Sequence, residues 1–454
     1  MRDWRASSRV ARHWRQVNGA APSIVCGLCP RQCEVGDGSF GFCRVRGSTG
    51  GEFHTFNYGK SVAVTEEVIE TEAIYHFSPG ARTLSLGSVG CMMSCDFCQN
   101  WDTSQVKHLD TEIVCEYSPE EIIEICRSND IGIISFTYND PVVWHEYVLD
   151  VSREASRNGI RTLYKSALYL QQEPAGELLE NIDIFSISLK SMDDGFYRRF
   201  AGGSLAPVLD RIKEIHASGR HLEISQLIIP GRNDRAEDVR RTVGWILDYL
   251  GCEVPLHFVG FHPAYRYTSV GRTSRESLLL AREIALGAGV RYCYLGNLFE
   301  TGINDTICAC GNKLVRRYGL EALTIGITET GARCADCGTR TPIKHPIVTD
   351  TGMSVDRGLL TRMKSTFLAW TQDAQAAHLR LRGLRGPASI HVLHDVSGRA
   401  ETHRLESRLA RVIVARKTEA DTGVKIYWDG PGELQILPVL DRAHYPTGGD
   451  EEHE

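Results

Sequence analysis

The chain has 454 residues, enough for two or three domains, and its 42% hydrophobic and 24% charged residues are ordinary for a globular protein. The formal net charge of -6 leaves no basic surface for a nucleic-acid backbone. No apolar run approaches the roughly 20 residues needed to cross a bilayer, and the N-terminus has no apolar stretch of the signal-peptide kind. We therefore expect a cytoplasmic protein without nucleic-acid or membrane partners.

Residues 1–80 show no regular pattern and are predicted to form an irregular, cysteine-rich segment. From residue 84 onward, short apolar runs alternate with amphipathic stretches, which predicts a parallel sheet with helical crossovers. The predicted strands are 84–89, 132–136, 162–167, 182–189, 222–229, 255–261 and 292–295. The predicted helices are 119–127, 142–158, 206–218, 236–250 and 274–288. Six or seven such units favour an open, partial barrel with its active site at the carboxyl ends of the strands.

After residue 296 the alternation stops, and a further cysteine group lies among turns. Residues 355–383 are predicted to be a helix. The stretches 390–394, 411–416, 424–428 and 433–437 alternate like strands, which indicates a small α+β module of unknown role. The predicted domains are therefore a cysteine-rich segment at 1–80, a partial barrel at 81–300, a metal-binding segment at 301–350 and the α+β module at 351–454.

The fifteen cysteines are distributed unevenly along the chain. Cys115, Cys126, Cys252 and Cys293 stand alone, and the other eleven fall into three tight groups. In a large chain without an export signal, clustered thiolates indicate metal binding rather than disulfides.

The central group follows directly on the predicted strand 84–89. Cys91, Cys95 and Cys98 have the spacing C-x3-C-x2-C, and three thiolates on one loop can bind three irons of a cubane [4Fe-4S] cluster. The fourth iron stays open to chelate S-adenosylmethionine (SAM), whose reductive cleavage yields a 5'-deoxyadenosyl radical; the cofactors carry this chemistry and the protein positions them. Zinc is the alternative, but it usually takes four protein ligands. Phe97 suits the adenine side of such a site.

Ten blocks of the sequence resemble one family in order, from about residue 26 to residue 338. They are CGLCPRQC, GFCRVR, YHFSPG, GCMMSCDFCQNW, TYNDPVVWHEY, SLKSMDDGFY, EISQLIIPGRND, VPLHFVGFHPAY, YCYLGN and NDTIC. The chain resembles the radical SAM enzymes of the AmmeMemoRadiSam system, which are similar to pyruvate formate-lyase activating enzymes. This resemblance implies a partial (β/α)6 barrel with SAM bound across its top.

The resemblance also implies roles for several residues. The segment Tyr138-Asn139-Asp140 matches the one that binds the SAM amino group, Lys190 matches a barrel lysine near SAM, and Asn297 matches a segment close to the adenine. Glu223 and His257 fall on strands where the family has polar residues facing the barrel.

Three positions depart from the family pattern. Asp140 stands where the family usually has Glu, which keeps the charge on a shorter side chain. The family's Asp-Leu-Lys reads Ser188-Leu189-Lys190, and its Thr-Asn-Gly reads Lys165-Ser166-Ala167. Because these segments shape the SAM and peptide sites of the activating enzymes, the changes weaken the case for a glycyl-radical activase.

The two outer cysteine groups are also predicted metal sites. Cys26, Cys29, Cys33 and Cys43 have the spacing C-x2-C-x3-C-x9-C, for which a second iron–sulfur cluster, a tetrahedral zinc and a mononuclear iron are all open. Cys308, Cys310, Cys334 and Cys337 form two knuckles, each followed by glycine, of the zinc-ribbon or rubredoxin type. A structural metal is favoured for this second set.

Two residues on the last predicted strands are candidate catalytic groups beside Lys190. Alternation allows Cys293 to point into the barrel, where a thiol would deliver the hydrogen atom that an epimerase needs; the alternative is a small buried hydrophobe. His257 either touches SAM or substrate or is a satisfied interior histidine. His262, five residues further on, has the opposite parity and is a weaker candidate.

Three functions compete beyond SAM cleavage. The first is hydrogen abstraction from a small molecule, such as inversion of a stereocentre in a sugar-like natural product. The second is modification or activation of a protein or peptide partner, as in the activating enzymes. The third, a metal-binding scaffold, has no need for an open iron. For the two catalytic hypotheses we expect an electron donor such as flavodoxin or ferredoxin.

Overall fold

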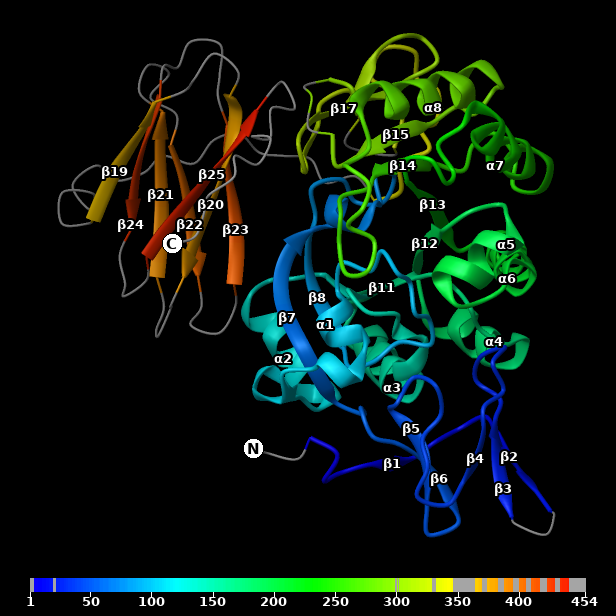
Figure 1. The fold of residues 1–454 in the computed structure, drawn as a ribbon. Coiled ribbons are helices and arrows are strands. Elements are labelled where there is room, and N and C mark those ends of the chain that lie inside the picture. The colour runs from blue at the N-terminus through cyan, green and yellow to red at the C-terminus, as the bar shows by residue number, and fades with distance from the viewer. Residues whose placement is uncertain are drawn as a thin grey trace, which may run out of the picture. The chain divides into compact units, whose positions relative to one another are not determined.

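The computed structural model describes residues 4–18, 22–298, 300, 302–328 and 332–345, and seven strands between residues 364 and 440. The chain forms two compact units. The first comprises residues 1–77 and 81–296, and the second comprises residues 78–80 and 297–454. Each is described by itself (Figure 1).

Seven parallel strands form the centre of the first unit, in the order β15-β14-β13-β12-β11-β10-β8. They are β8 (Arg82–Ser88), β10 (Ile133–Thr137), β11 (Arg161–Ser166), β12 (Ile184–Leu189), β13 (His221–Ile228), β14 (Leu256–Gly260) and β15 (Cys293–Gly296). The antiparallel strand β7 (Lys60–Val68) pairs with β8, and β9 (Cys115–Glu116) pairs with β7. Each predicted strand overlaps one parallel strand, and the predicted open, partial barrel of parallel strands is confirmed.

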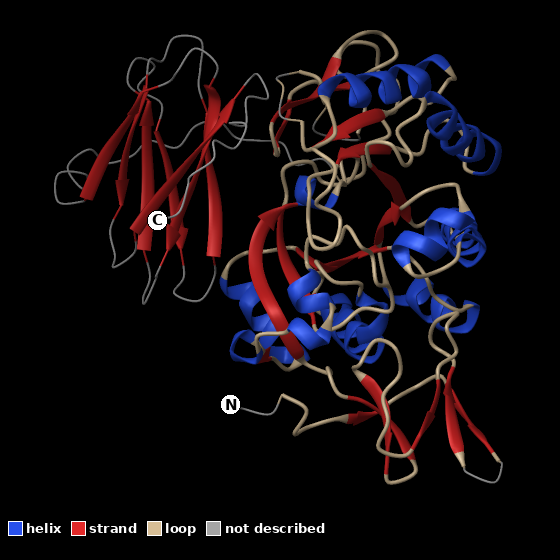
Figure 2. Cartoon of the chain, in the orientation of Figure 1, coloured by secondary structure: helices blue, strands red, loops and turns tan. Residues whose placement is uncertain are grey.

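The helices of the first unit alternate with the strands along the chain and surround the sheet (Figure 2). The longer ones are α2 (Pro119–Ser128), α3 (His145–Arg157), α4 (Gln172–Asn181), α6 (Leu205–Ala217), α7 (Ala236–Tyr249) and α8 (Arg275–Gly287). The shorter ones are α1 (Trp101–Ser104), α5 (Asp194–Phe196), η1 (Ile69–Glu72), η2 (Val106–His108), η3 (Thr111–Ile113), η4 (Pro141–Trp144) and the π-helical turn η5 (Tyr197–Ala201). Five longer helices were predicted. Helix α4 was not, because only Pro174, Ala175 and Leu178 of its ten residues are buried.

The two faces of the parallel sheet differ in chemistry. Strand register places Ser186, Glu223 and Ser225 on the inner face. His257 is in register with Ser225, and Tyr294 is in register with His257, so both also lie on the inner face. The alternate positions, such as Phe136 and Phe258, face the helices and are buried and apolar. A parallel sheet buried on both faces is normally apolar throughout, so the polar inner face indicates a site within the barrel.

An apolar plug closes the amino ends of the barrel strands. Residues 69–77, which include η1, contribute Ile69, Ile74 and Phe77. These pack against inward residues near the starts of three strands, Ile133, Leu163 and Ile184. Polar groups inside the barrel therefore have access to ligands only toward the carboxyl ends of the strands.

The N-terminal segment is more ordered than predicted. It contains β1 (Arg9–Val10), β2 (Trp14–Val17), β3 (Ser23–Cys26), β4 (Glu34–Gly36), β5 (Arg46–Thr49) and β6 (Glu52–Thr55). These form two small antiparallel sheets with the orders β1-β6-β5 and β2-β3-β4. The expectation of an irregular segment is wrong because strands of two to four residues are too short to show a two-residue period.

The second unit is composed of strands over its described residues. A small sheet has the order β16 (Thr306–Ile307), β17 (Lys313–Tyr318) and β18 (Glu321–Thr324). The later strands are β19 (Lys364–Ala369), β20 (Ala374–Arg382), β21 (Ala388–His394), β22 (Ala400–Leu405), β23 (Ala410–Arg416), β24 (Gly423–Trp428) and β25 (Glu433–Leu440). The four predicted C-terminal strands fall within β21, β23, β24 and β25 and are confirmed.

The helix predicted at 355–383 is wrong where the structure describes that range. Residues 364–369 and 374–382 are strands β19 and β20, and residues 355–363 lie outside the described residues. The alanine-rich start of β20 resembles a helix, but β20 pairs with β23 on one side and β25 on the other. Sheet pairing overrides local propensity here.

Candidate functional site

The loop after β8, residues 89–98, carries the central three cysteines and is called the cysteine loop. Its glycine, Gly90, has a φ of +84°, and a Cβ there would lie 2.7 Å from Val45 Cγ1 and 2.9 Å from the Cys43 carbonyl oxygen. The π-helical turn η5 fixes the other end: Ser94 N donates to Ala201 O at 3.1 Å, and Asp96 N donates to Phe200 O at 2.9 Å. The loop is therefore held from two sides.

All three cysteines of this loop line a cavity of about 420 Å³, called the loop cavity. The other lining groups come mainly from the carboxyl ends of β10, β11 and β12 and from the β7–η1 region. Its polar lining residues include Glu67, Thr71, Glu72, Gln99, Asn100, Ser104, Thr137, Tyr138, Asn139, Asp140, Lys165, Ser166, Ser188 and Lys190. The predicted residues Tyr138, Asn139, Asp140 and Lys190 are thus brought together with Cys91, Cys95 and Cys98.

Asp140 is a buried carboxylate fixed by the neighbouring strand. It accepts hydrogen bonds from Ser166 Oγ at 2.8 Å, Ala167 N at 2.7 Å and Val142 N at 3.2 Å. Burial raises the pKa of Asp140, while these hydrogen bonds and the charge of Lys190 oppose the rise. A buried carboxylate of this kind gains from a cationic partner such as an ammonium group.

The segment Tyr138-Asn139 links β10 to the residues that follow the cysteine loop. Tyr138 has a φ of +63°, and its carbonyl accepts a hydrogen bond from Asn100 Nδ2 at 2.7 Å. Asn139 Oδ1 accepts a hydrogen bond from Thr103 Oγ1 at 3.1 Å. A left-handed backbone at a non-glycine residue costs about 1–3 kcal/mol and is typical of functional sites.

The deep end of the loop cavity is a network of charged groups. Glu72 accepts hydrogen bonds from Ser135 at 2.8 Å and Thr137 at 2.9 Å, and Lys165 Nζ lies 3.3 Å from Glu72 Oε2. Glu67 accepts a hydrogen bond from the Tyr138 hydroxyl at 2.9 Å. Burial and the nearby Glu72 raise the pKa of Glu67. The sequence analysis did not identify Glu67 and Glu72 because both precede the cysteine motif. The available signal was the presence of polar residues, such as Ser135 and Thr137, within otherwise apolar strands, since buried polar residues need partners.

The comparisons with known proteins decide the family. The profile of the Radical SAM superfamily matches residues 85–246. An uncharacterized protein of Methanocaldococcus jannaschii is 35% identical over 321 residues, which cover 70% of this chain and 95% of the relative. The chain belongs to the radical SAM superfamily.

Two characterised relatives of this radical SAM enzyme are more distant. The 4-hydroxyphenylacetate decarboxylase activating enzyme of Clostridium scatologenes is 24% identical over 223 residues, which cover 45% of this chain and 71% of the relative. The pyruvate formate-lyase 1-activating enzyme of Escherichia coli K12 is 25% identical over 192 residues, which cover 40% and 77%. The predicted resemblance to the radical SAM superfamily and to these activating enzymes is confirmed.

The superfamily implies a [4Fe-4S] cluster and SAM, and the loop cavity fits both. Burial raises the pKa of the Cys95 thiol to about 12, and burial and then Asp140 raise that of Cys91. Buried thiols that repel one another's charges become thiolates when a cation binds them. Cys91, Cys95 and Cys98 would hold the cluster, Asp140 would receive the SAM ammonium, and Lys190 would contribute positive charge beside Cys95. When bound, the cluster would supply the electron that cleaves SAM.

The expectation that Cys293 points into the barrel is wrong. Cys293 is in register with Leu256, whereas Tyr294 is in register with the inward residue His257. Cys293 therefore faces the helices, and Arg282 of α8 donates a hydrogen bond to its carbonyl at 3.2 Å. Its side chain is buried, and burial raises the pKa of the thiol to about 12. The one-residue difference in parity excludes it as a hydrogen donor inside the barrel.

His257 faces inward but does not line the loop cavity. Its Nε2 lies 2.7 Å from Glu223, which also accepts hydrogen bonds from the backbone N–H groups of Tyr75 and His76. The Tyr75 ring packs edge-on against the His257 ring at 4.7 Å. This is the satisfied interior histidine that the sequence left open as an alternative.

Two further predicted cofactor residues lie elsewhere. Phe97 is buried in an apolar cluster with Phe196, Ile229, Phe261 and Tyr267, not among the residues that line the loop cavity. Asn297 has a φ of +59° and begins the second unit. A contact of Asn297 with adenine stays a prediction. His262 is 3.1 Å from the side chain of Gln99, at the edge of the cysteine loop.

The four thiols at 308–337, called the knuckle group, converge on one point. The sulfurs of Cys308 and Cys337 are 3.7 Å apart, as are those of Cys310 and Cys334. A tetrahedral zinc with Zn–S bonds of about 2.3 Å requires sulfurs about 3.8 Å apart. The glycine after each knuckle, Gly311 or Gly338, has a positive φ that reverses the chain. We propose that this group holds one zinc or iron ion.

The N-terminal cysteine group lies beside the cysteine loop. Burial raises the pKa of Cys29 to about 12, and the charges of Cys26, Cys43 and Cys33 add to the rise. Arg31, between Cys29 and Cys33, donates to the Met92 carbonyl of the cysteine loop at 2.6 Å. That this group binds a metal stays a prediction.

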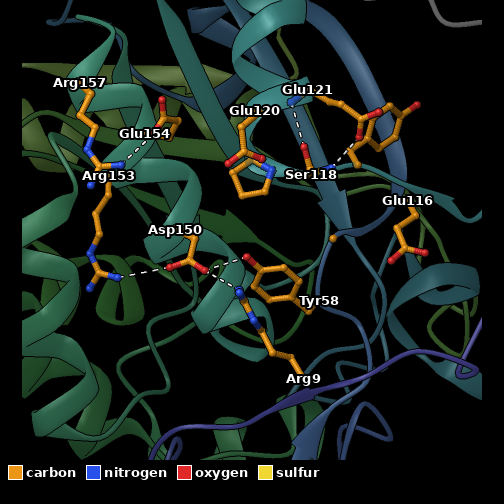
Figure 3. Close-up of a pocket in the computed structure, with 13 residues that line it drawn as sticks. Arg9, Tyr58, Glu116, Ser118, Glu120, Glu121, Asp150, Arg153, Glu154 and Arg157 are labelled. Atoms are coloured by element: carbon orange, nitrogen blue, oxygen red, sulfur yellow. Dashed lines mark hydrogen bonds and ion pairs between the residues drawn. The ribbon is translucent and has the colours of Figure 1, made fainter.

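A separate cavity of about 700 Å³ lies between β1, residues 58–59, the start of α2 and α3 (Figure 3). Its central carboxylate, Asp150, accepts hydrogen bonds from Arg9 and Tyr58, both at 2.7 Å, and Arg153 lies 3.3 Å away. These charges are satisfied by one another.

Within the described residues, no helix is long and apolar enough to span a membrane.

Proposed function

We propose that this radical SAM enzyme abstracts a hydrogen atom from a polar small molecule bound in the loop cavity. The observation that carries the proposal is the ion pair of Lys165 with Glu72, at 3.3 Å, in the cavity that the three cysteines line. A few convergent polar groups in a small cavity are typical of sites that orient a small ligand. The substrate would carry hydroxyl or carboxylate groups that pair with Lys165, Glu67 and Ser188.

The departures from the activating-enzyme pattern support this substrate class. Lys165, Ser166 and Ser188, which replace family residues at the carboxyl ends of β11 and β12, all line the loop cavity. Lys165 adds a charge, and Ser166 orients Asp140. A polar floor is suited to a small hydrophilic substrate because unpaired buried polar groups would reject an apolar one.

The proposal does not include epimerisation by a thiol. Inversion at a stereocentre requires a hydrogen donor opposite the deoxyadenosyl group, and Cys293 faces the helices. An electron donor of the flavodoxin or ferredoxin class completes the proposed reaction, because each SAM cleavage consumes one electron.

A second candidate is modification of a protein or peptide. It is favoured by two relatives whose names describe them as activating enzymes of a decarboxylase and of pyruvate formate-lyase. Under this reading the loop cavity would receive a peptide segment of the partner, and Lys165 would contact its backbone or a side chain.

One experiment tests the substrate class. The reconstituted enzyme receives SAM, a reductant and either the small-molecule or the protein fraction of cells grown in deuterated medium. Under the leading proposal, only the small-molecule fraction accelerates 5'-deoxyadenosine formation and transfers deuterium into it. Acceleration by the protein fraction alone, with a carbon-radical signal on a protein, would replace the leading proposal with the second.

Two variants connect this result to the cavity. Lys165→Met should lower the substrate-dependent rate about 10- to 100-fold, because a charged hydrogen bond contributes about 1.5–3 kcal/mol, and should retain substrate-independent cleavage. Lys213→Met removes a surface lysine that pairs with Asp210 at 2.9 Å on α6 and should leave both rates unchanged. Equal rates for Lys165→Met and the wild type would remove Lys165 from the substrate site.

A further inference from the structure

Three metal-ligating side chains meet where the N-terminal segment contacts α3 and α4. His13 lies between β1 and β2, His145 begins α3, and Glu177 lies on α4. The Nε2 atoms of His13 and His145 are 2.9 Å and 2.7 Å from Glu177 Oε2. All three ligand atoms lie within 4.8 Å of one another. We propose that these residues, the His13–His145–Glu177 site, bind a divalent zinc-like cation that fastens the N-terminal segment to the barrel.

The distances fit a metal with a small adjustment. Zinc takes imidazole nitrogen at about 2.0–2.1 Å and carboxylate oxygen at about 2.0–2.2 Å, so tetrahedral ligand atoms lie about 3.3 Å apart. The two separations observed are about half an ångström shorter, which small side-chain rotations correct. Two imidazoles and one carboxylate form a common zinc ligand set that leaves a fourth position for water.

Burial and outer contacts preorganise the ligands. The side chains of His145, His13 and Glu177 are 0%, 6% and 21% exposed. The Arg12 guanidinium donates to the other oxygen of Glu177, Oε1, which leaves Oε2 directed at the two imidazoles. Contacts of this kind to a ligating carboxylate orient it toward its metal.

Two independent features point to the same place. His13 has a φ of +56°, a left-handed backbone that is costly for a non-glycine residue and calls for a local reason. Its ring packs edge-on against the His145 ring at 5.3 Å.

The position of the site explains what the metal would do. The His13 carbonyl accepts a hydrogen bond from Gly27 N at 2.7 Å, directly after Cys26. Next to the site, Arg46 donates to both carboxylate oxygens of Glu146 at 2.8 Å. A metal at His13 would therefore fix the strand that carries Cys26 against α3 and α4, independently of the substrate proposed above.

Cobalt binding to the full-length protein tests the site. The iron–sulfur and knuckle sites are first filled, and Co²⁺ is then titrated and followed by absorption and by metal analysis. The wild type should bind one further equivalent, with a spectrum that lacks the charge-transfer band of cobalt thiolates. His13→Gln and Glu177→Gln should lose this equivalent. His54→Gln is the control and should retain the further cobalt equivalent. It alters another histidine of the N-terminal segment, whose Nδ1 lies 3.1 Å from Ser8 Oγ.

The outcomes are decisive in both directions. A wild type that binds no further equivalent, or binds it only with a thiolate band, overturns the proposal and leaves a hydrogen-bonded His–Glu–His cluster. The same result follows if both ligand variants keep the equivalent. Zn²⁺ should also raise the melting temperature of the wild type and not that of His13→Gln, because a ion that binds only the folded state stabilises it. His13 lies in a connecting segment, so this variant serves if Glu177→Gln does not fold.

Discussion

The cysteine loop and the knuckle group use the same ligand in opposite ways. The three thiols of the loop line a cavity of about 420 Å³ together with charged side chains from the barrel strands. The four thiols of the knuckle group face one another in two pairs, each 3.7 Å apart. Four protein ligands close the coordination sphere of a metal and serve structure, whereas an incomplete set leaves a position for a reacting molecule. Geometry, more than residue type, separates catalytic from structural cysteines here.

The pKa values of the thiols also differ between the cysteine loop and the knuckle group. In the cysteine loop, burial raises the pKa of Cys91 and Cys95, so their thiolates depend on the charge of a bound cluster. In the knuckle group, the backbone N–H of Cys337 and the amide of Asn312, at 3.4 Å, lower the pKa of Cys334. Although the backbone N–H of Asn312 opposes the rise, burial and hydrogen bonds with the neighbouring thiols raise the pKa of Cys310 to about 12, so the backbone lowers the pKa of Cys334 but not that of every thiol in the group.

The largest effect should come from removing the open ligand set. The triple variant Cys91→Ala, Cys95→Ala, Cys98→Ala should produce no 5'-deoxyadenosine from SAM, because no thiolates remain to hold the cluster. The measurement is product formation under reducing, anaerobic conditions after cluster reconstitution. A matched triple variant at the lone cysteines Cys115, Cys126 and Cys252 should retain activity. Undiminished SAM cleavage in the triple variant would show that Cys91, Cys95 and Cys98 do not hold the cluster.

A smaller effect is expected from the carboxylate that completes the open site. Asp140→Ala removes a charge-assisted contact to the SAM ammonium worth about 1.5–3 kcal/mol, so SAM affinity should fall about 10- to 100-fold. Equilibrium binding to the reconstituted enzyme measures this change. Ser166→Ala removes one hydrogen bond to Asp140 but keeps the charge of Asp140, so SAM affinity should fall less in this variant than in Asp140→Ala. If both variants lose affinity equally, Asp140 positions the loop rather than the ligand.

The smallest effect on catalysis should come from the closed set. The double variant Cys308→Ser, Cys337→Ser should lose one metal equivalent and become more sensitive to protease between residues 302 and 345, because structural metal binding is coupled to folding. SAM cleavage should persist. Cys252→Ser, at an exposed lone cysteine, is the control for metal content. Loss of SAM cleavage together with the metal would assign the knuckle group a part in catalysis.

Much of the barrel could be predicted from local pattern. Its strands are apolar on the helix-facing side and bounded by turn residues, and all seven predicted runs became parallel strands. The C-x3-C-x2-C loop indicated its chemistry through spacing, since three thiolates within eight residues can bind one cluster. The departures at Lys165 and Ser188 were also visible in the sequence, although not their common cavity.

Other features were decided only by tertiary pairing. Strand β20 is a strand because two neighbours pair with it, against its own helical composition. Cys293 faces the helices because its register with Leu256 sets its parity. Glu67 and Glu72 reach the loop cavity because β7 pairs antiparallel with β8 and η1 plugs the barrel.

The sequence by itself therefore determined the class of chemistry and the succession of strands and helices, because both depend on short-range spacing. The tertiary structure decided which polar residues share the cavity, that Cys293 faces the helices, and that His13, His145 and Glu177 meet at one point. Those three residues lie as many as 164 positions apart along the chain. Convergence over such separations is set by the packing of whole elements, and local spacing carries no record of it.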